Sequence, residues 1–286
     1  MRRPCSVLFA LLLAQAAAVS AQPKGSLFII GGGDRDEAMM SRFVALAGRF
    51  GRGRIVVFPM ASSEPKETGD SLVRELKKLG AKEAVSFVLS REQALAEGSD
   101  RILDGAGGVF FSGGDQARQT AVLLHTPIHR RLLALYADGC VMGGTSAGAA
   151  VMSEVMITGD ESRKPGEGHE FETIEAGNVM TAEGFGFLKT VIIDQHFVVR
   201  KRLNRLISLV AEKPHLLGVG IDESTAIVVE GGRLFEVIGE GQVLVWDGSQ
   251  ARVKAAAGRR IGLSGMIFHI LLPGERFDLA SRTAVP

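Results

Sequence analysis

The amino-acid sequence predicts an α/β fold, in which a doubly wound, mainly parallel sheet is followed by an antiparallel β extension. Between residues 26 and 210, short apolar runs alternate with segments of helical periodicity. This βαβα order is typical of a parallel sheet with helices on both faces. After residue 217, short apolar runs separated by glycine turns indicate antiparallel strands. We therefore expect a single domain over residues 22–286, with residues 231–286 as its β-rich C-terminal extension.

Each predicted element rests on its own local pattern. Buried parallel strands are short, continuous apolar runs, whereas helices show apolar residues three or four positions apart. The predicted strands cover residues 26–30, 54–58, 84–89, 108–111, 139–142 and 190–194, and then 217–221, 225–229, 234–238, 242–246 and 266–272. The predicted helices cover residues 36–47, 66–79, 115–124, 128–138 and 202–210, with a helical turn at 100–103. Residues 158–187 show neither pattern, so we expect a long surface loop that flanks the site as a lid.

The first 21 residues differ in kind from the rest of the chain. Arg2 and Arg3 precede an apolar segment at residues 7–19, and small residues follow up to Ala21. This pattern is typical of a secretory signal peptide, and the apolar segment is too short to span a membrane. We therefore expect cleavage after Ala21 and a secreted or periplasmic mature protein.

Charge and cysteine content exclude several classes of partner. The 33 basic residues include Arg2 and Arg3, so the mature chain keeps 31 against 32 acidic residues, a net formal charge of −1. Without a basic field, we expect no nucleic-acid and no membrane partner. Cys140 is the one cysteine of the mature chain, and its apolar neighbours predict a core position. No histidine and cysteine cluster has zinc-ligand spacing, so we predict no metal site.

The segment Gly144-Thr145-Ser146-Ala147-Gly148 fits G-x-S-x-G, the pattern of a nucleophile elbow. In such an elbow a tight strand-to-helix turn presents the serine at a helix N-terminus, where the helix dipole favours a developing oxyanion. The pattern has two free positions, so the alternative is a glycine-rich turn whose serine caps a helix. The choice depends on whether a base and a carboxylate can reach Ser146.

Two segments further along the chain supply a base and carboxylates. His196 follows one apolar strand, and Asp222 and Glu223 follow the next. Because the carboxyl ends of parallel strands meet at one edge, we expect these side chains beside Ser146 at the edge of the central sheet. Taken alone, the histidine could be a hydrogen-bonded loop residue, and the acids could serve a turn or an ion pair. Taken with Ser146, they favour a catalytic triad.

These motifs together resemble those of the cyanophycinase family of serine peptidases, which degrade the storage polymer multi-L-arginyl-poly-L-aspartate. The matching segments are residues 31–33, 111–116, 144–150, 194–197 and 220–226, with Arg200, Arg202 and Arg205 after the fourth. They extend over most of the mature chain. The resemblance implies a fold similar to the class I glutamine amidotransferase-like domain, and a homodimer.

The resemblance also implies a role for each member of the triad. Ser146 would be the nucleophile, His196 the general base and acid, and Glu223 the carboxylate that orients His196. The order Ser-His-Glu differs from that of α/β-hydrolases, in which the acid precedes the histidine. The implied reaction is acyl transfer to the serine followed by hydrolysis, which needs no cofactor. We expect the N–H groups of Gly114 and Ala147 to form the oxyanion hole.

The implied substrate has an aspartate backbone with arginine joined to each side-chain carboxyl group. A site for it needs cations for carboxylates and anions for guanidinium groups. The predicted substrate-binding residues are Gln116, Asp194, Gln195, Arg200, Arg202 and Arg205. Because helical positions two apart diverge, we expect only one or two of the arginines to face the substrate and the others to lie on a solvated helix face.

The other predicted contacts leave alternatives open. Asp194 contacts a substrate guanidinium group or holds a loop, and Gln116 positions the substrate backbone. The Gly31-Gly33 turn does not continue into the G-x-G-x-x-G pattern of a dinucleotide site, so we interpret it as a tight turn near the substrate.

Two rival functions remain open. A related serine exopeptidase acting on short aspartyl peptides would need only a narrow pocket, and a catalytically silent peptide-binding homologue would not need the triad. Relative to the family, residues 161–183 carry an insertion that could border the cleft. This insertion affects the assignment of the polymer as substrate more than the assignment of the reaction. The signal peptide implies an exported enzyme that acts on scavenged substrate.

Overall fold

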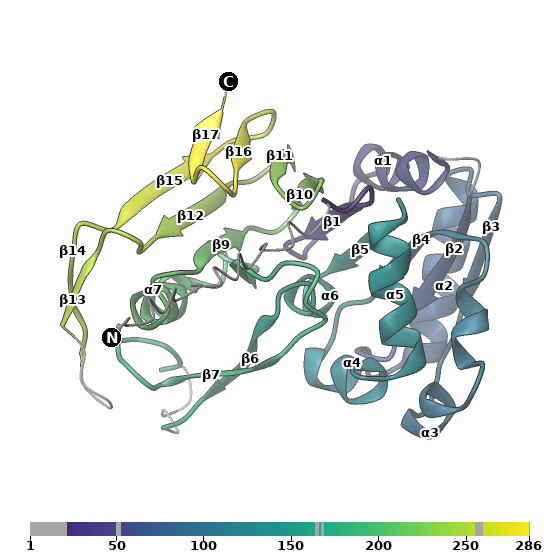
Figure 1. The fold of residues 1–286 in the computed structure, drawn as a ribbon, viewed down its shortest axis with the longest axis horizontal. Coiled ribbons are helices and arrows are strands. Elements are labelled where there is room, and N and C mark those ends of the chain that lie inside the picture. Colours follow the sequence, from purple (N-terminus) through teal and green to yellow (C-terminus); the bar gives the residue numbers. More distant parts are fainter. Residues whose placement is uncertain (1–21, 50–52, 164–165, 167–168, 255–259, 286) are drawn as a thin grey trace, which may run out of the picture.

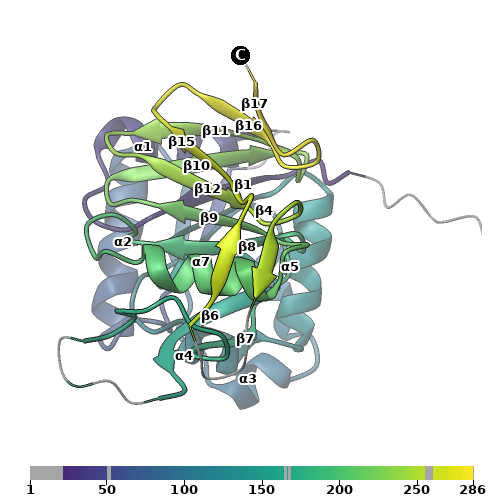
Figure 2. The ribbon, with the colours of Figure 1, turned by 90° about the vertical axis from the view of Figure 1, so that its left-hand side faces the viewer.

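A computed structural model describes the chain at residues 22–49, 53–163, 166, 169–254 and 260–285. The predicted signal peptide, residues 1–21, lies outside the described residues. Within them the chain forms a nine-stranded sheet, a four-stranded sheet and two short hairpins (Figures 1 and 2).

The nine-stranded sheet confirms the predicted α/β fold. In spatial order its strands are β17 (Thr283–Val285), β16 (Arg276–Asp278), β11 (Leu234–Gly239), β10 (Thr225–Glu230), β1 (Ser26–Ile30), β5 (Val141–Thr145), β4 (Ala106–Phe111), β2 (Arg54–Phe58) and β3 (Glu83–Ser86). The strands from β1 to β3 in this order run parallel, and the others form antiparallel ladders. β5 continues to Thr145, past the predicted end at residue 142, so Ser146 stands where the strand ends.

Helices cover both faces of the parallel half, as the sequence predicts. α1 (Glu37–Ala47) and α2 (Pro65–Lys78) pack on the face that carries Phe28 and Ile30. The opposite face carries Leu27 and Ile29. It is covered by α3 (Arg91–Leu95), the 3-10 helix η2 (Ser99–Leu103), α4 (Gln116–Leu123) and α5 (Pro127–Ala137). Since successive strand side chains point to opposite faces, the short strand β1 contributes to two core layers.

A second sheet carries two of the segments that matter for function. Its order is β15 (Ile267–Leu271), β12 (Val243–Asp247), β9 (Leu217–Ile221) and β8 (Val191–Gln195). One face shares a core with the large sheet, and the other is covered by α7 (Leu203–Glu212), as Figure 2 shows. The expectation that residues 190–194 and 217–221 belong to the central sheet is therefore wrong. Both sheets are buried on two faces, so their apolar runs look alike in the sequence.

The strands after residue 231 complete both layers. β11, β16 and β17 extend the large sheet, while β12 and β15 extend the second one. Their ladders are antiparallel, as predicted. A separate hairpin consists of β13 (Arg252–Lys254) and β14 (Gly262–Ser264). The C-terminal strands thus pair with both sheets instead of forming an appendage.

The prediction of a long loop at residues 158–187 is wrong at residues 158–161 and 179–183, which form strands; the described residues between the two strands lie in turns and irregular structure. β6 (Val155–Glu161) and β7 (Val179–Glu183) pair there as an antiparallel hairpin. Most side chains of β7 are exposed, so the strand lacks the apolar alternation that marks a half-buried strand. The buried Met156 ties β6 to the core shared by the two sheets.

Candidate active site

Ser146 lies at the sharp turn between β5 and α6 (Ala147–Ala150). Its backbone has φ 54° and ψ −111°, a strained conformation of the kind found at functional turns. The flanking glycines are needed because a Cβ on Gly144 would overlap the carbonyl group of Gly148, and one on Gly148 would overlap that of Phe111. The Ser146 hydroxyl contacts His196 instead of capping the helix. The local geometry is therefore that of a nucleophile elbow.

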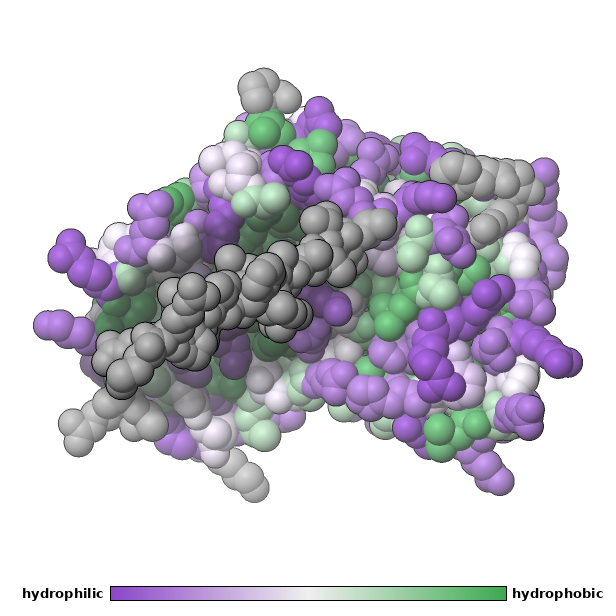
Figure 3. Space-filling model, in the orientation of Figure 1, coloured by the Kyte–Doolittle hydropathy of each residue, from purple (hydrophilic) through white to green (hydrophobic). Residues whose placement is uncertain are grey.

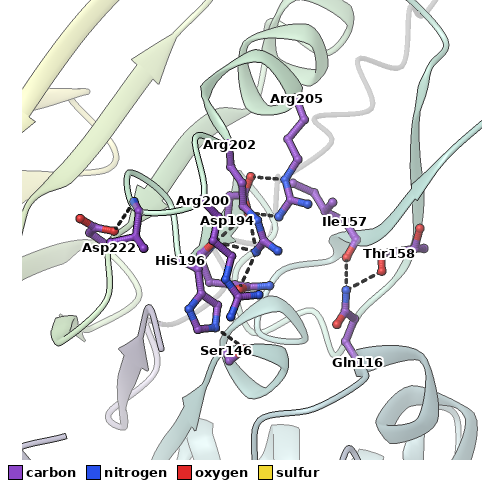
Figure 4. Close-up of polar contacts among 12 residues, drawn as sticks. Gln116, Ser146, Ile157, Thr158, Asp194, His196, Arg200, Arg202, Arg205 and Asp222 are labelled. Atoms are coloured by element: carbon purple, nitrogen blue, oxygen red, sulfur yellow. Dashed lines mark hydrogen bonds and ion pairs between the residues drawn. The ribbon is translucent and has the colours of Figure 1, made fainter. Parts of the chain in front are cut away.

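The imidazole of His196 lies between Ser146 and Glu223, and Figure 4 shows the ring turned toward the serine. Its Nε2 is 2.8 Å from Ser146 Oγ, and its Nδ1 is 2.5 Å from Glu223 Oε1. The adjacent Asp222 accepts hydrogen bonds from two amides of the turn after His196, each at 3.1 Å. Of the two neighbouring acids, Glu223 thus contacts the imidazole and Asp222 holds the turn.

The carboxyl end of β1 connects the three segments that carry these side chains. The carbonyl groups of residues 30–32 accept hydrogen bonds from the amides of Ser146, His196 and Ser224, at 3.0, 2.7 and 2.9 Å respectively. The glycine turn at this point was predicted to lie near the substrate. The turn packs against the imidazole, where a Cβ on Gly32 would overlap the ring. Although β8 and β9 belong to the second sheet, their ends therefore reach the same place as Ser146.

Burial lowers the pKa of the His196 imidazole below its ordinary value of 6.5. The positive charges of Arg200 and Arg202 act in the same direction, while the Glu223 carboxylate opposes them. With a lowered pKa the imidazole is neutral at neutral pH. A neutral imidazole within hydrogen-bond distance of Ser146 can accept the hydroxyl proton.

A polar pocket of about 240 Å³, here called the arginine pocket, opens beside Ser146. It is lined by Gly114, Asp115, Gln116, Ser146, Thr158, Gly159, Gln195, Arg200, Arg202 and Arg205. All three arginines line it, which contradicts the expectation that helical geometry turns at least one of them away. The reason is that α7 begins at Leu203, so Arg200 and Arg202 lie in the turn before the helix. Figure 4 shows the three side chains gathered above Ser146.

Arg205 is fixed in the pocket wall by Asp194. Both side chains are buried, and Arg205 Nε is 2.7 Å from Asp194 Oδ2, with a second contact from Nη2 to Oδ1. The guanidinium carbon also lies 5.2 Å from the centre of the Phe171 ring. Asp194 is absent from the pocket lining and is committed to Arg205. Of the two alternatives for Asp194, the contacts favour the one in which it holds neighbouring structure.

The other two arginines differ in how firmly they are held. Arg202 donates hydrogen bonds to the main-chain and side-chain oxygens of Gln195, each at 2.8 Å. Burial and the nearby Arg205 lower the pKa of Arg202 to about 10, so it remains cationic at neutral pH. Arg200 is half-exposed, and its Nε lies 3.8 Å from Glu223 Oε1. Arg200 is thus the least constrained cation of the pocket.

Gln116 connects the pocket to the β6–β7 hairpin. Its amide nitrogen donates hydrogen bonds to the carbonyl groups of Ile157 and Thr158, at 2.8 and 2.7 Å (Figure 4). This fixes β6 so that Thr158 and Gly159 form a wall of the pocket. The sequence analysis missed these two residues because a loop was predicted there. Gln116 therefore positions the protein backbone beside the pocket.

Gly114 and Ala147, the predicted oxyanion donors, belong to segments that adjoin Ser146. Ala147 directly follows Ser146 in the chain, and Gly114 lines the arginine pocket together with Ser146. A Cβ built on Gly113 would lie 3.4 Å from the Cβ of Ser146, so this loop passes close to Ser146. Gly114 itself has φ 131°, and a Cβ there would overlap the carbonyl group of Ala61. The glycine is thus required by its own backbone neighbours.

Other features bear on the predicted classes of partner. In the described part of the chain, no group of three histidine, cysteine, aspartate or glutamate side chains is placed to hold a metal ion. Over the same residues, no helix combines the length and apolar character needed to cross a membrane. The face seen in Figure 3 carries mainly hydrophilic side chains with smaller apolar areas between them. Cys140 is fully buried, which confirms its predicted core position.

The sequence model of peptidase family S51 matches residues 27–237, which include Ser146, His196 and Glu223. The chain belongs to this family. It is 34% identical to the cyanophycinase of Nostoc sp., over 92% of this chain and 88% of that protein. It is 35% identical to the cyanophycinase of Trichormus variabilis with the same coverage, and 35% identical to that of Geminocystis herdmanii over 89% of this chain and 94% of that protein. The predicted membership of the cyanophycinase family is confirmed, and this S51 chain is a serine-type peptidase.

A solved structure shares the fold of this S51 peptidase. The crystal structure of a peptidase from an acI-B1 actinobacterium matches it with a TM-score of 0.63. The match covers 90% of this chain and 98% of that one, at 22% identity. The likeness confirms the α/β architecture.

Proposed function

We propose that this peptidase hydrolyses cyanophycin, multi-L-arginyl-poly-L-aspartate, to β-Asp-Arg dipeptides through an acyl-enzyme on Ser146. The observation that carries the proposal is the imidazole of His196, in hydrogen-bond contact with both Ser146 and Glu223. This arrangement activates a hydroxyl group for acyl transfer. The cyanophycinase relatives and the cationic pocket beside the serine support the choice of substrate.

In the first half of the reaction, Ser146 Oγ attacks the scissile carbonyl carbon while His196 Nε2 takes the hydroxyl proton. Glu223 stabilises the resulting imidazolium through Nδ1 and keeps the ring in the productive orientation. The N–H groups of Ala147 and Gly114 donate to the oxyanion of the tetrahedral intermediate, and one such donor contributes about 3 kcal/mol. The imidazolium then protonates the leaving amine, which departs as the acyl-enzyme forms.

In the second half, water replaces the amine. His196 takes a proton from the water as it attacks the ester carbonyl, and then returns a proton to Ser146 Oγ. The lowered pKa of His196 suits both steps, because the ring must be neutral before each attack.

Substrate recognition follows from the charges of the polymer. The α-amino group of each arginine is used in the isopeptide bond, so each arginine keeps a free α-carboxylate. Arg200 and Arg202 provide cations for such a carboxylate beside Ser146, and the half-exposed Asp115 provides an anion for a guanidinium group. Arg205, already paired with Asp194, completes the wall.

The decisive experiment incubates the purified mature protein with cyanophycin and identifies the products by mass spectrometry. We expect β-Asp-Arg dipeptides from the wild type, none from Ser146→Ala, and undiminished release from Ser249→Ala, a variant of an exposed serine. A fluorophosphonate probe should label the wild type and fail to label Ser146→Ala. Turnover of aspartyl dipeptides without attack on the polymer would indicate the related exopeptidase instead. Labelling that persists in Ser146→Ala would contradict the nucleophile assignment.

We also propose that the enzyme is exported and forms a homodimer. The composition of residues 1–21 supports export, and the family resemblance supports the dimer. Intact-mass analysis of protein from the periplasm and medium should give an N-terminus at Gln22. Light scattering should give the mass of two chains. A mature N-terminus at Met1, or a monomer mass at micromolar concentration, would contradict the respective proposal.

A further inference from the structure

Another pocket, here called the Arg35 pocket, borders the backbone around the nucleophile. Its volume is about 210 Å³, and its lining includes Arg35, Thr68, Ser71, Gly113 and Thr145. Gly113 and Thr145 directly precede two residues that line the arginine pocket. The two pockets therefore meet at the segments that surround Ser146.

The two pockets lie on opposite faces of the large sheet. The Arg35 pocket is bordered by α2, whose Leu72 belongs to the core layer on the α1 side. The arginine pocket is bordered by the start of α4, whose Leu123 belongs to the core layer on the other side. A peptide carbonyl group held at Ser146 carries one substituent on each side of the scissile bond. A substrate bound in one pocket therefore extends toward the other.

The groups that line the Arg35 pocket suit a carboxylate. Arg35 Nη2 is 3.0 Å from Glu75 Oε2, whereas its Nε is buried and donates to no described residue. A buried donor without an acceptor is costly, and the planar guanidinium group is matched best by an anion with two oxygens. Thr68 and Ser71 add hydroxyl groups that can donate to the same anion. The volume admits a carboxylate, since one water molecule occupies about 30 Å³.

We propose that the Arg35 pocket is a substrate subsite, which binds a carboxylate across the scissile bond from the arginine pocket. This inference rests on the proposed function. In the polymer, the bound group is the free α-carboxylate of the arginine in the unit beyond the cleaved bond. Glu75 competes for the same guanidinium group and so limits the affinity of the subsite.

The first test is a double-mutant cycle on a three-unit (β-Asp-Arg) peptide. Two further peptides each have the arginine carboxylate of one terminal unit converted to a carboxamide. In the wild type, one of these conversions should raise KM about tenfold, the usual size for a charged hydrogen bond. Arg35→Gln should raise KM for the intact peptide by a similar factor and abolish the effect of that conversion. If the carboxamide conversion still raises KM by the same factor in Arg35→Gln, the two effects are independent and the proposal is overturned.

A structural role for the Arg35–Glu75 ion pair gives a different result. Glu75→Gln breaks the same pair but frees the guanidinium group, so KM should fall instead of rising. Arg42→Gln is the matched control, because Arg42 forms a comparable ion pair with Glu236 and lines neither the arginine pocket nor the Arg35 pocket. It should leave KM unchanged. If Arg35→Gln and Glu75→Gln raise KM alike, the pocket is not a subsite.

A binding measurement separates failure of the subsite from failure of the proposed function. In a Ser146→Ala background, calorimetry with the three-unit peptide should show a Kd about tenfold higher when Arg35→Gln is added. Binding that depends on Arg35 without cleavage by the wild type would contradict the proposed hydrolysis and leave the subsite intact. Cleavage by the wild type, with no dependence of KM or Kd on Arg35, would overturn the subsite and leave the proposed hydrolysis intact. Absence of binding in the Ser146→Ala protein overturns the subsite.

Discussion

Gly32 lies directly beneath the imidazole of His196. A Cβ at Gly32 would overlap Cε1 and Nε2 of the ring, and Nε2 is the atom that faces Ser146. The carbonyl group of Gly32 also accepts a hydrogen bond from the amide of Ser224, next to Glu223 in the chain. The backbone of Gly32 therefore packs against the imidazole ring. It cannot shift without moving the segment that carries Glu223.

Gly32→Ala should lower kcat by about 100-fold or more with a much smaller change in KM, since a misplacement of about 1 Å in a reacting group costs that much. Steady-state kinetics on cyanophycin provides the measurement. Gly80→Ala is the matched control: Gly80 also has a positive φ, of 92°, but its Cβ would meet open space. Both variants carry similar backbone strain, so an equal loss of activity in the two would contradict a positioning role for Gly32.

Glu223→Gln should lower kcat by about 10⁴-fold, because an amide no longer stabilises the imidazolium and can hold the wrong tautomer. The exposed Glu240→Gln serves as the control and should retain full activity. Single-turnover kinetics would show whether acylation is the impaired step. A loss of less than tenfold in Glu223→Gln would indicate that Glu223 does not act on the imidazole during catalysis.

Arg200→Gln should change the pH dependence of kcat/KM. The neutral imidazole is the active form, so the rate falls as pH drops through the pKa of His196. The positive charge of Arg200 lowers that pKa, and its removal should raise it. The acid limb of the profile should therefore move to higher pH. Arg49→Gln removes an exposed arginine that is paired with Glu230, and it should leave the limb in place. Movement toward lower pH in Arg200→Gln would contradict the electrostatic argument.

Asp194→Ala should lower the free energy of unfolding by about 3–5 kcal/mol, because it leaves the buried guanidinium group of Arg205 without its partner. Urea denaturation of the mature chain measures this directly. Glu230→Ala, which breaks an ion pair between half-exposed side chains, should cost less than about 1 kcal/mol. Equal values for the two substitutions would show that the Asp194–Arg205 pair adds nothing beyond a surface pair.

The parts of the site set by local geometry could be predicted from the sequence. In the elbow at residues 144–148, Gly144 is required by the carbonyl group of Gly148, four residues away, so this constraint acts within the motif itself. The alternation of strands and helices from β1 to β5 was predicted for the same reason, since apolar runs act over short distances. Strand β7 was missed because its side chains are largely exposed and carry no apolar signal.

Choices between equivalent residues depended on packing. Asp222 and Glu223 are adjacent acids after the same strand, and only the turn after His196 determines that the first binds amides while the second reaches the imidazole. The orientation of the three arginines was predicted wrongly because helical divergence was assumed for all three, whereas Arg200 and Arg202 lie in the turn before α7. Positions two apart in a turn need not diverge as they do on a helix.

Local patterns of apolar residues, glycines and motifs were enough to predict the strands of the parallel half, the elbow around Ser146 and the family to which the chain belongs. The packing of the layers places His196 and Glu223 at the ends of strands of a second sheet and Gly32 against the imidazole. The same packing brings Arg35 into one pocket with Thr145, the residue before Ser146. These relationships join segments far apart in the chain, and burial between layers, which a linear pattern does not encode, brings them together.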